Sequence, residues 1–313
     1  MVQLEKRIRL YYVNKEAFSY LEVIKFKDGQ TEVSPNQLID VVKISVNADN
    51  VDIFPVLYQI AEYCKSKPAL IFTYLIGLRG DKNAFTNQTT ENFVNSVILP
   101  LLMHLNSKEF SLYIYTPHTT LFKEYPYKVL IKTINPIEDL TLIYNGLIKT
   151  YGADCTIVGF PDRSAHNRFE FPYNLYFVIN KKRVNNNGDT RLEHHFEPET
   201  LSGLRNIKGT PVILFVDDLC DGGRTFTSAA ELIKKEIPEK EFIFCLFVTH
   251  FVGGDESLKN LNNHFDVFIY KTPIYLESNY EKKLVDYPLP EVNKDLNFYI
   301  WNTSLTTNML VGL

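Results

Sequence analysis

The sequence has no long hydrophobic run and no secretory signal. No apolar stretch reaches the roughly 18 residues that a membrane-spanning helix needs. The first ten residues, MVQLEKRIRL, lack the apolar core of a signal peptide. These absences predict a cytoplasmic protein that has no membrane partner.

Cysteine and basic charge are also scarce. The four cysteines are scattered without a C-x-x-C spacing, which predicts neither a zinc site nor a disulfide framework. The net charge is −4, so bulk electrostatics gives no support for nucleic-acid binding. We therefore expect no nucleic-acid partner.

The rest of the composition is that of a soluble globular protein. The chain has 313 residues, of which 45% are hydrophobic and 22% charged, which is enough for two domains with a sizeable core. Buried-strand patterns alternate with helical patterns in both halves. This alternation predicts two α/β domains with parallel sheets.

The most informative stretch runs from Val212 to Thr225 and reads VILFVDDLCDGGRT. Its first five residues predict a buried parallel strand that ends at Val216, before the paired acids Asp217 and Asp218. A loop with two glycines follows, and a helical pattern begins at Thr225. This order is typical of a phosphate site at the carboxyl end of an α/β sheet.

The residues of this turn have the chemistry of a ribose-phosphate site. Gly222 and Gly223 let backbone N–H groups approach a phosphate, and Thr225 can cap the helix and hold a phosphate oxygen. The two carboxylates accept hydrogen bonds and so suit the vicinal hydroxyls of a sugar. The alternative is an ordinary turn before a capped helix, which does not need two carboxylates ahead of two glycines.

This stretch resembles the binding motif of the type I phosphoribosyltransferase fold, and most closely that of the ribose-phosphate pyrophosphokinase family. The resemblance covers about residues 20–275, where further family-like segments follow in the family's order. It implies two tandem phosphoribosyltransferase-like domains, each with a mostly parallel sheet flanked by helices. Residues 1–135 would be an N-terminal ATP-binding domain, and residues 136–313 a C-terminal domain with the ribose-phosphate motif.

Two segments of the first half resemble the family's ATP site. Taken alone, FKDGQTEV is the pattern of a tight hairpin turn, and GLRGDK is a charged loop after a buried strand. The resemblance implies that the aromatic ring of the first segment stacks on adenine and that the arginine of the second holds ATP phosphates. The ATP-binding residues that it implies are Phe26, Asp28, Gln30, Arg79, Asp81 and Lys82.

Two further strand ends provide candidate metal and pyrophosphate ligands. A lone histidine such as His118 is more often structural, whereas the resemblance implies a magnesium ligand. The segment PDRSAHNR resembles the family's pyrophosphate loop, with Asp162 and Arg168 in the matching places and Asp162 as a second metal ligand. Ser164 and Ala165 replace the two glycines of that loop. Asp162 taken alone could be a helix N-cap.

Lys181 and Arg183 follow the buried strand LYFVI. Three consecutive basic residues at the end of a strand are usually exposed to solvent and have no further role. The resemblance instead implies that both side chains are catalytic and stabilise charge as diphosphate leaves ATP. The turn at residues 185–189, NNNGD, is predicted to belong to a mobile flap that excludes water.

The implied reaction transfers the β,γ-diphosphoryl group of MgATP to the anomeric 1-hydroxyl of a ribose phosphate and releases AMP, with Mg2+ as the cofactor. The implied ribose-phosphate ligands are Asp217, Asp218, Asp221, Gly222, Gly223, Arg224 and Thr225.

The acceptor depends on two departures from the family motif. Gly222 stands where the family has threonine, which opens space, and Arg224 adds a guanidinium that can hold a second phosphate. This favours ADP-ribose, and the loop CDGGRTF resembles a phage-type branch that makes ADP-ribose pyrophosphate in NAD+ reconstitution. Ribose 5-phosphate is the alternative acceptor.

Two other function classes stay open, a phosphoribosyltransferase and a non-catalytic regulator. The adenine-binding segment argues against the first, and the presence of Lys181 and Arg183 argues against the second. The resemblance also implies a homodimer or larger homo-oligomer. If the protein is encoded by a phage, its expected location is the cytoplasm of the host cell. The aromatic tail at residues 276–313 has no family counterpart.

Overall fold

The protein is described by a computed structural model that divides into two compact units, Met1–Asn135 and Pro136–Leu313. The described residues are 11–12, 23–25, 31–33, 41–46, 57–58, 61–62, 69–75, 94–118, 121–123, 125–169, 172–186, 189–196, 198–273, 283–285 and 298–301. Within these ranges no helix combines the length and apolarity that a membrane crossing needs.

The first unit contains a sheet with the strand order β1-β4-β5-β6-β7. Its edge strand β1 is antiparallel to β4, and the other neighbours are parallel. The central strand β5 is apolar and buried along most of its length, as a parallel strand covered on both faces requires. The bounds are β1 Tyr11–Tyr12, β4 Val41–Val46, β5 Ala69–Leu75, β6 Leu112–Tyr115 and β7 Lys132–Ile134.

Short helices and a small hairpin complete the described part of this unit. Helix α3, Leu99–Ser107, continues a π-helical turn at Val94–Ile98 and buries Leu101, Leu102 and Leu105 on one side. Helix α4 spans Tyr127–Leu130. The strands β2, Val23–Lys25, and β3, Thr31–Val33, form an antiparallel pair.

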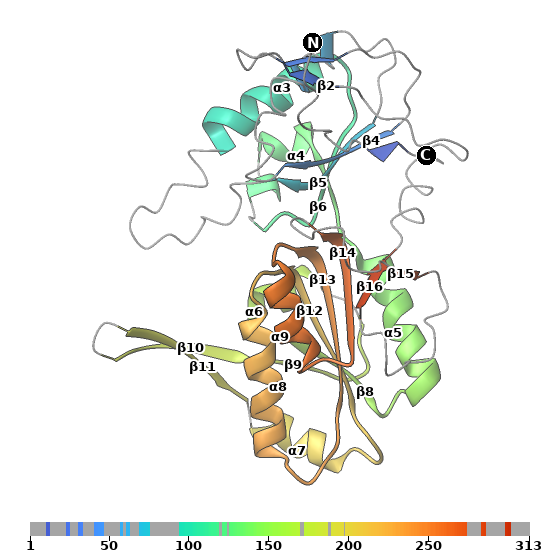
Figure 1. Cartoon of the computed structure of the whole chain (residues 1–313), viewed down its shortest axis with the longest axis vertical. Helices are drawn as coiled ribbons and strands as arrows, with labels where there is room; N and C mark the ends of the chain where they lie inside the picture. Colours follow the sequence, from blue (N-terminus) through green and yellow to red (C-terminus); the bar gives the residue numbers. More distant parts are fainter. Residues whose placement is uncertain are drawn as a thin grey trace. The chain divides into compact units, whose positions relative to one another are not determined.

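The second unit is built on a wholly parallel sheet with the order β15-β16-β14-β13-β12-β8-β9 (Figure 1). Its interior strand β12, between β13 and β8, carries the acidic pair. The bounds are β8 Thr156–Phe160, β9 Tyr176–Val178, β12 Val212–Cys220, β13 Ile243–Phe251, β14 Val267–Pro273, β15 Lys283–Val285 and β16 Phe298–Trp301. The last two strands show that parts of the C-terminal tail extend this sheet.

Helices cover both faces of this sheet. Successive residues of β12 point to opposite sides, so they pack against different helices. Phe215 packs among apolar residues of α7, α8 and α9, whereas Leu214 packs among those of α5 and α6. Figure 1 shows α8 and α9 on one face and α5 on the other. The bounds are α5 Ile137–Tyr151, α6 Arg163–Arg168, α7 Pro198–Asn206, α8 Arg224–Glu236 and α9 Asp255–Asn262.

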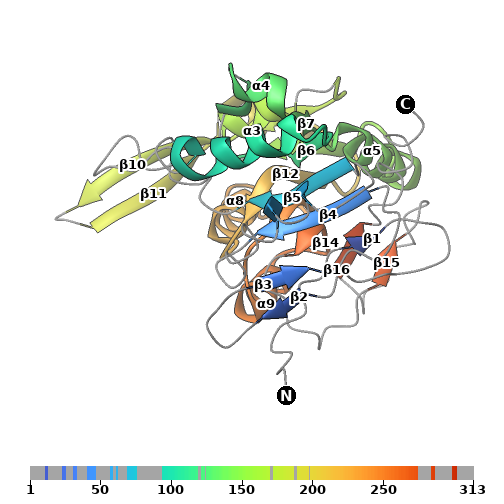
Figure 2. The same cartoon turned by 90° about the horizontal axis from the view of Figure 1, so that it is seen from above.

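A two-stranded hairpin projects from the second unit (Figures 1 and 2). It consists of β10, Asn180–Asn186, and β11, Asp189–His195, paired antiparallel from Asn180↔His195 to Asn186↔Asp189. The predicted turn over residues 185–189 was therefore too long.

Candidate functional site

The acidic pair lies at a place where the sheet loses a strand on one side. Strand β12 pairs with β8 only as far as Phe215↔Gly159, but with β13 as far as Cys220↔Phe251. The prediction that the strand ends at Val216 was wrong, because the longer β13 keeps β12 extended through Cys220. Among the described residues, Asp217 and Asp218 consequently have a neighbouring strand on the β13 side alone.

Helix α6 supplies a cation to this edge. The Nη1 atom of Arg168 lies 2.6 Å from Oδ1 of Asp218 and 3.5 Å from Oδ1 of Asp217. The Asp218 side chain is only 1% exposed, so its charge depends on this contact. The structure therefore joins the predicted pyrophosphate-loop arginine to the predicted ribose-binding acids.

Asp162 is the N-cap of α6, and its Oδ1 accepts a hydrogen bond of 2.9 Å from the backbone N–H of Ala165. A short helix thus replaces the predicted loop. Ser164 and Ala165 stand where the family has glycines, and these residues lose less conformational entropy in a helix than glycine does. The N-cap alternative for Asp162 is confirmed; its role as a metal ligand stays a prediction.

Burial raises the pKa of Asp217 well above its ordinary value near 3.8. The negative charge of Asp218, a hydrogen bond with Asp218 and the more distant charge of Asp162 raise this pKa further, while Arg168 lowers it. Two carboxylates thus lie beside the Arg168 guanidinium, and a third adds to the local negative charge. Such a cluster favours ligands that donate hydrogen bonds or bring positive charge.

Gly223 is the N-cap of α8 and adopts a left-handed conformation with φ 75°. A Cβ atom at this position would lie 2.6 Å from Cδ2 of Leu261 in α9, so both conformation and space require glycine. The helix begins at Arg224, and the predicted capping role of Thr225 was wrong because Thr225 lies inside the first turn.

The first turn of α8 offers backbone donors to an anion. The first N–H groups of a helix have no acceptor within it. In the described part of the chain, those of Arg224 and Thr225 have no other acceptor either. The positive end of the helix dipole adds to this attraction, so the turn has the properties of a phosphate site.

Arg224 and Gly222 face open surroundings. The Arg224 side chain is exposed, and it makes no ion pair or hydrogen bond with any residue that the structure describes. A Cβ atom at Gly222 would meet nothing within 4 Å. The loop can therefore accommodate a ligand larger than a single phosphate, with a cation beside it.

The sequence did not single out Thr249 as a site residue. The register of β12 and β13 places it opposite Asp218, on the same face of the sheet. Its hydroxyl is fully buried, and no hydrogen-bond partner for it is present among the described residues. Only the pairing of the two strands reveals this further polar group beside the acids.

The structure leaves the remaining predicted residues as predictions. Lys181 and Arg183 lie in β10, where their backbones pair with His194 and Leu192. His118 is half-buried and belongs to the first unit. The predicted ATP residues Phe26, Asp28, Gln30, Arg79, Asp81 and Lys82 lie outside the described residues. Within the described ranges, no group of three or more His, Cys, Asp or Glu side chains forms a ready-made metal site.

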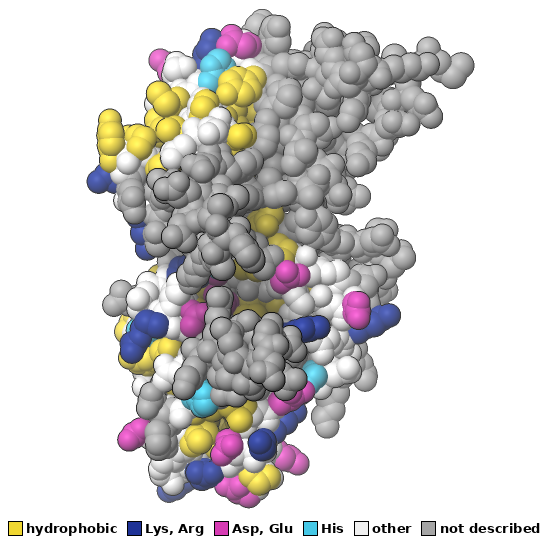
Figure 3. All heavy atoms as spheres, turned by 90° about the vertical axis from the view of Figure 1, so that its left-hand side faces the viewer, with side chains coloured by type: hydrophobic (Ala, Val, Ile, Leu, Met, Phe, Trp, Pro, Cys, Tyr) yellow, Lys and Arg dark blue, Asp and Glu magenta, His cyan; other side chains and the backbone are white. Residues whose placement is uncertain are grey.

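Charge is mixed on the surface of the second unit. Figure 3 shows Lys or Arg side chains interspersed with Asp or Glu over its described part, in the lower half of the view. The face drawn there has no broad basic area of the kind that tracks a nucleic-acid backbone.

The comparison with protein-family models finds no match, and neither does the comparison with curated proteins. Among solved structures, the chain is similar to phosphoribosylpyrophosphate synthetase from Mycobacterium smegmatis, with a TM-score of 0.60 and 14% identity over 95% of this chain and 90% of that one. The chain has the fold of phosphoribosylpyrophosphate synthetase. The predicted fold class, two tandem phosphoribosyltransferase-like domains with mostly parallel sheets, is thereby confirmed.

Two phosphoribosyltransferases give weaker matches than the synthetase. Xanthine-guanine-hypoxanthine phosphoribosyltransferase from Helicobacter pylori has a TM-score of 0.29 and 12% identity over 53% of this chain and 91% of its own. Orotate phosphoribosyltransferase from Aeropyrum pernix has a TM-score of 0.25 and 11% identity over 44% of this chain and 72% of its own. These scores are too low to carry an argument. The synthetase fold rests on the Mycobacterium smegmatis match.

We predict that Gly223→Ala destabilises the synthetase-like fold by about 1–3 kcal/mol, because alanine is strained at this φ and its Cβ meets Leu261. Gly222→Ala is the matched control in the same loop and should change stability by about 0.5 kcal/mol or less. Urea unfolding followed by circular dichroism measures both variants. Equal stability of the two would contradict the assigned geometry.

We predict that Asp217→Asn stabilises the protein at neutral pH. A carboxyl whose folded-state pKa is raised contributes stability below its unfolded pKa and loses it as pH rises through the folded pKa. The variant should be more stable than the wild type at pH 7 to 8, with the difference vanishing as pH falls towards about 4. Thermal unfolding in a metal chelator measures the profile, and exposed Asp221→Asn is the control. A pH-independent difference would argue against the raised pKa.

Proposed function

We propose that the protein is an ATP-dependent diphosphokinase. It transfers the β,γ-diphosphoryl group of MgATP to the anomeric 1-hydroxyl of a ribose phosphate and releases AMP. The observation that carries this proposal is an acidic pair, Asp218 buried and Asp217 half-buried, beside a helix N-terminus that suits an anion, in a chain with the fold of phosphoribosylpyrophosphate synthetase. A sugar diol and a phosphate are the groups that this pair and this turn suit.

In this proposal the ribose hydroxyls donate hydrogen bonds to Asp217 and Asp218. The negative charges of Asp218 and Asp162 disfavour the charged form of Asp217, so each donated hydrogen bond offsets part of the electrostatic cost of holding these acids together. Arg168 holds Asp218 in place from α6. The phosphorylated arm of the sugar binds at Gly223, Arg224 and Thr225.

The favoured acceptor is ADP-ribose, with ribose 5-phosphate as the alternative. ADP-ribose carries a diphosphate at its 5-position, so it needs space and positive charge beyond the first phosphate. The open surroundings of Gly222 would provide the space, and the exposed guanidinium of Arg224 would provide the positive charge. A guanidinium can bind a phosphate through two parallel hydrogen bonds. The product would be ADP-ribose pyrophosphate, for use in NAD+ reconstitution.

The carboxylates also fit magnesium. Mg2+ prefers oxygen ligands and is commonly held by one or two carboxylates together with substrate phosphates. Asp162 and Asp217 are near enough for the charge of the first to raise the pKa of the second, and these two would hold the ion. Bound magnesium would neutralise charge on the transferred diphosphate. His118 stays a further proposed ligand.

The donor side of the proposal rests on the family resemblance. Phe26, Asp28 and Gln30 would hold adenine, and the residues that would hold the ATP phosphates are Arg79, Asp81 and Lys82. Lys181 and Arg183 would stabilise charge on the leaving AMP and the transferred group. They lie in a projecting hairpin, which is the kind of element that closes over a substrate to exclude water.

Measuring AMP release from MgATP with each acceptor tests the acceptor assignment. We expect turnover with ADP-ribose, and we expect Arg224→Ala to lower kcat/KM for it by about 10- to 100-fold, because a hydrogen bond to a charged group contributes about 1.5–3 kcal/mol. The same variant should change the rate with ribose 5-phosphate far less. Lys235→Ala removes an exposed cation from the far end of α8 and is the control.

Three outcomes would overturn parts of this proposal. Turnover of ribose 5-phosphate but not of ADP-ribose would reject the favoured acceptor. Consumption of a phosphoribosyl pyrophosphate donor without ATP-dependent AMP release would instead identify a phosphoribosyltransferase. Absence of both reactions would favour a non-catalytic regulator.

We predict that Lys181→Ala and Arg183→Ala each lower kcat by about 100-fold or more with little effect on folding, because both cations would act on charge that develops in the transition state. Lys182→Ala is the matched control, because it removes a neighbouring cation of the same strand to which the proposal gives no role. Steady-state kinetics with circular dichroism measures all three variants. Unchanged turnover of Lys181→Ala would remove the role assigned to that side chain.

A further inference from the structure

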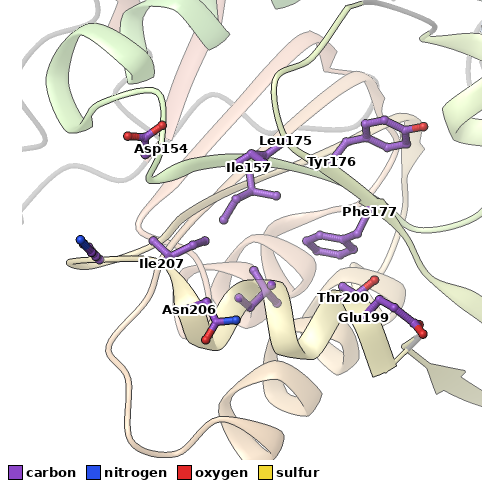
Figure 4. Close-up of a pocket in the computed structure, with 12 residues that line it drawn as sticks. Asp154, Ile157, Leu175, Tyr176, Phe177, Glu199, Thr200, Asn206 and Ile207 are labelled. Atoms are coloured by element: carbon purple, nitrogen blue, oxygen red, sulfur yellow. The ribbon is translucent and has the colours of Figure 1, made fainter.

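A cavity of about 520 Å³ opens between β9 and α7 in the second unit (Figure 4). Its floor is formed by the buried side chains of Ile157, Phe177 and Leu204. Small-molecule sites have volumes of roughly 300–1,000 Å³ and are lined mostly by apolar and aromatic groups. The cavity therefore has the size and lining of a small-molecule site, although no role in the proposed reaction uses it.

One apolar side chain of the wall remains accessible. Leu175 lines the cavity and is 40% exposed. Together with the aromatic and aliphatic side chains of the floor it gives the cavity an apolar lining, which favours a ligand with an apolar ring.

The charged side chains at the rim of the cavity determine which head group a ligand can carry. Asp154 and Glu199 are exposed carboxylates, and Lys208 is the one cation among the residues that line the cavity. The rim is net negative, so it repels phosphates and carboxylates. It complements a group that donates N–H bonds or carries positive charge.

We propose that this cavity binds a small aromatic molecule that has a cationic or N–H-donating head group and no phosphate. The ring lies on Ile157, Phe177 and Leu204, and the head group meets Glu199 or Asp154 at the rim. This ligand differs in charge from the anionic substrates of the proposed reaction. The cavity is therefore a separate site.

The cavity lies where it can influence the proposed catalytic elements. Strand β9 leads into β10, and α7 follows β11, so the walls come from the two chain segments at the base of the hairpin. The Tyr176 ring also stacks on His166 of α6, with ring centroids 5.0 Å apart. A bound molecule would hold β9 and α7 together, and so restrict the hairpin. The consequence for turnover rests on the proposed function.

A larger side chain at Gly203 would fill the cavity. It lines the cavity within α7, and a Cβ atom there would meet nothing within 4 Å. Gly203→Phe places a ring in the open space without displacing the core. Gly203→Ala is the matched control, because it also replaces a helical glycine by a better helix former and leaves most of the volume open.

Benzamidine, benzamide and benzoate are three probes with the same ring and different charge. Isothermal titration calorimetry should show binding in the order benzamidine, benzamide, benzoate for the wild type and for Gly203→Ala. Gly203→Phe should weaken benzamidine by about tenfold or more. Glu199→Gln, which removes a rim charge and keeps the volume, should weaken benzamidine but not benzamide.

Several outcomes would overturn the proposal. Equal benzamidine affinity in Gly203→Phe and Gly203→Ala would place the binding elsewhere, and benzoate binding as tightly as benzamidine would refute the assigned charge preference. No binding of any probe would reject the site. If Gly203→Phe instead converts a dimer to a monomer in sedimentation, the surface belongs to a second copy of the chain.

Hydrogen exchange separates this site from the proposed function. Benzamidine should slow amide exchange in β10 and β11 of the wild type, and the effect should disappear in Gly203→Phe. Unchanged exchange would refute the coupling to the hairpin. Neither calorimetry nor exchange requires turnover, so failure of AMP release would count against the proposed function alone.

Discussion

The packing of two adjacent carboxylates at an incomplete edge of a parallel sheet is the constraint on which the site depends. Asp218 is almost fully buried, and the pKa of half-buried Asp217 is raised by desolvation and by the negative charges of Asp218 and Asp162. Burying such charge is costly unless partners offset it. The proteins that keep such a cluster generally use it, and ribose hydroxyls with magnesium are the partners that the proposed reaction supplies.

The surrounding elements serve this edge in different ways. Strand β13 continues beyond β8 and keeps the acids extended, while α6 returns to the same edge with Asp162 and Arg168. The first turn of α8 follows directly and presents its N–H groups, with Gly223 fitted tightly against α9. These elements bring the acids, the guanidinium and the helix N-terminus to one edge of the sheet. The β10–β11 hairpin projects from the same unit, and its base is joined to β9 and α7, which line the cavity.

Sequence reasoning predicted the central motif because its signals are local. An apolar run, two acids and a glycine pair in one stretch predict a strand, a turn and a helix from short-range rules. It was wrong where a distant partner decided the outcome. The strand continues to Cys220 because β13 pairs with it, and the helix N-cap is Gly223 because α9 packs against that turn.

The sequence by itself determined the α/β class, the order of the segments and the presence of an acidic pair before a glycine turn. Periodicity and turn chemistry act over a few residues, so one chain is enough to reveal them. Only the tertiary structure decided that Arg168 meets Asp218 across 50 residues and that Thr249 lies opposite the same acid. It also decided that β9 and α7 enclose a cavity. Contacts between distant segments depend on how strands pair and helices pack, which no local pattern specifies.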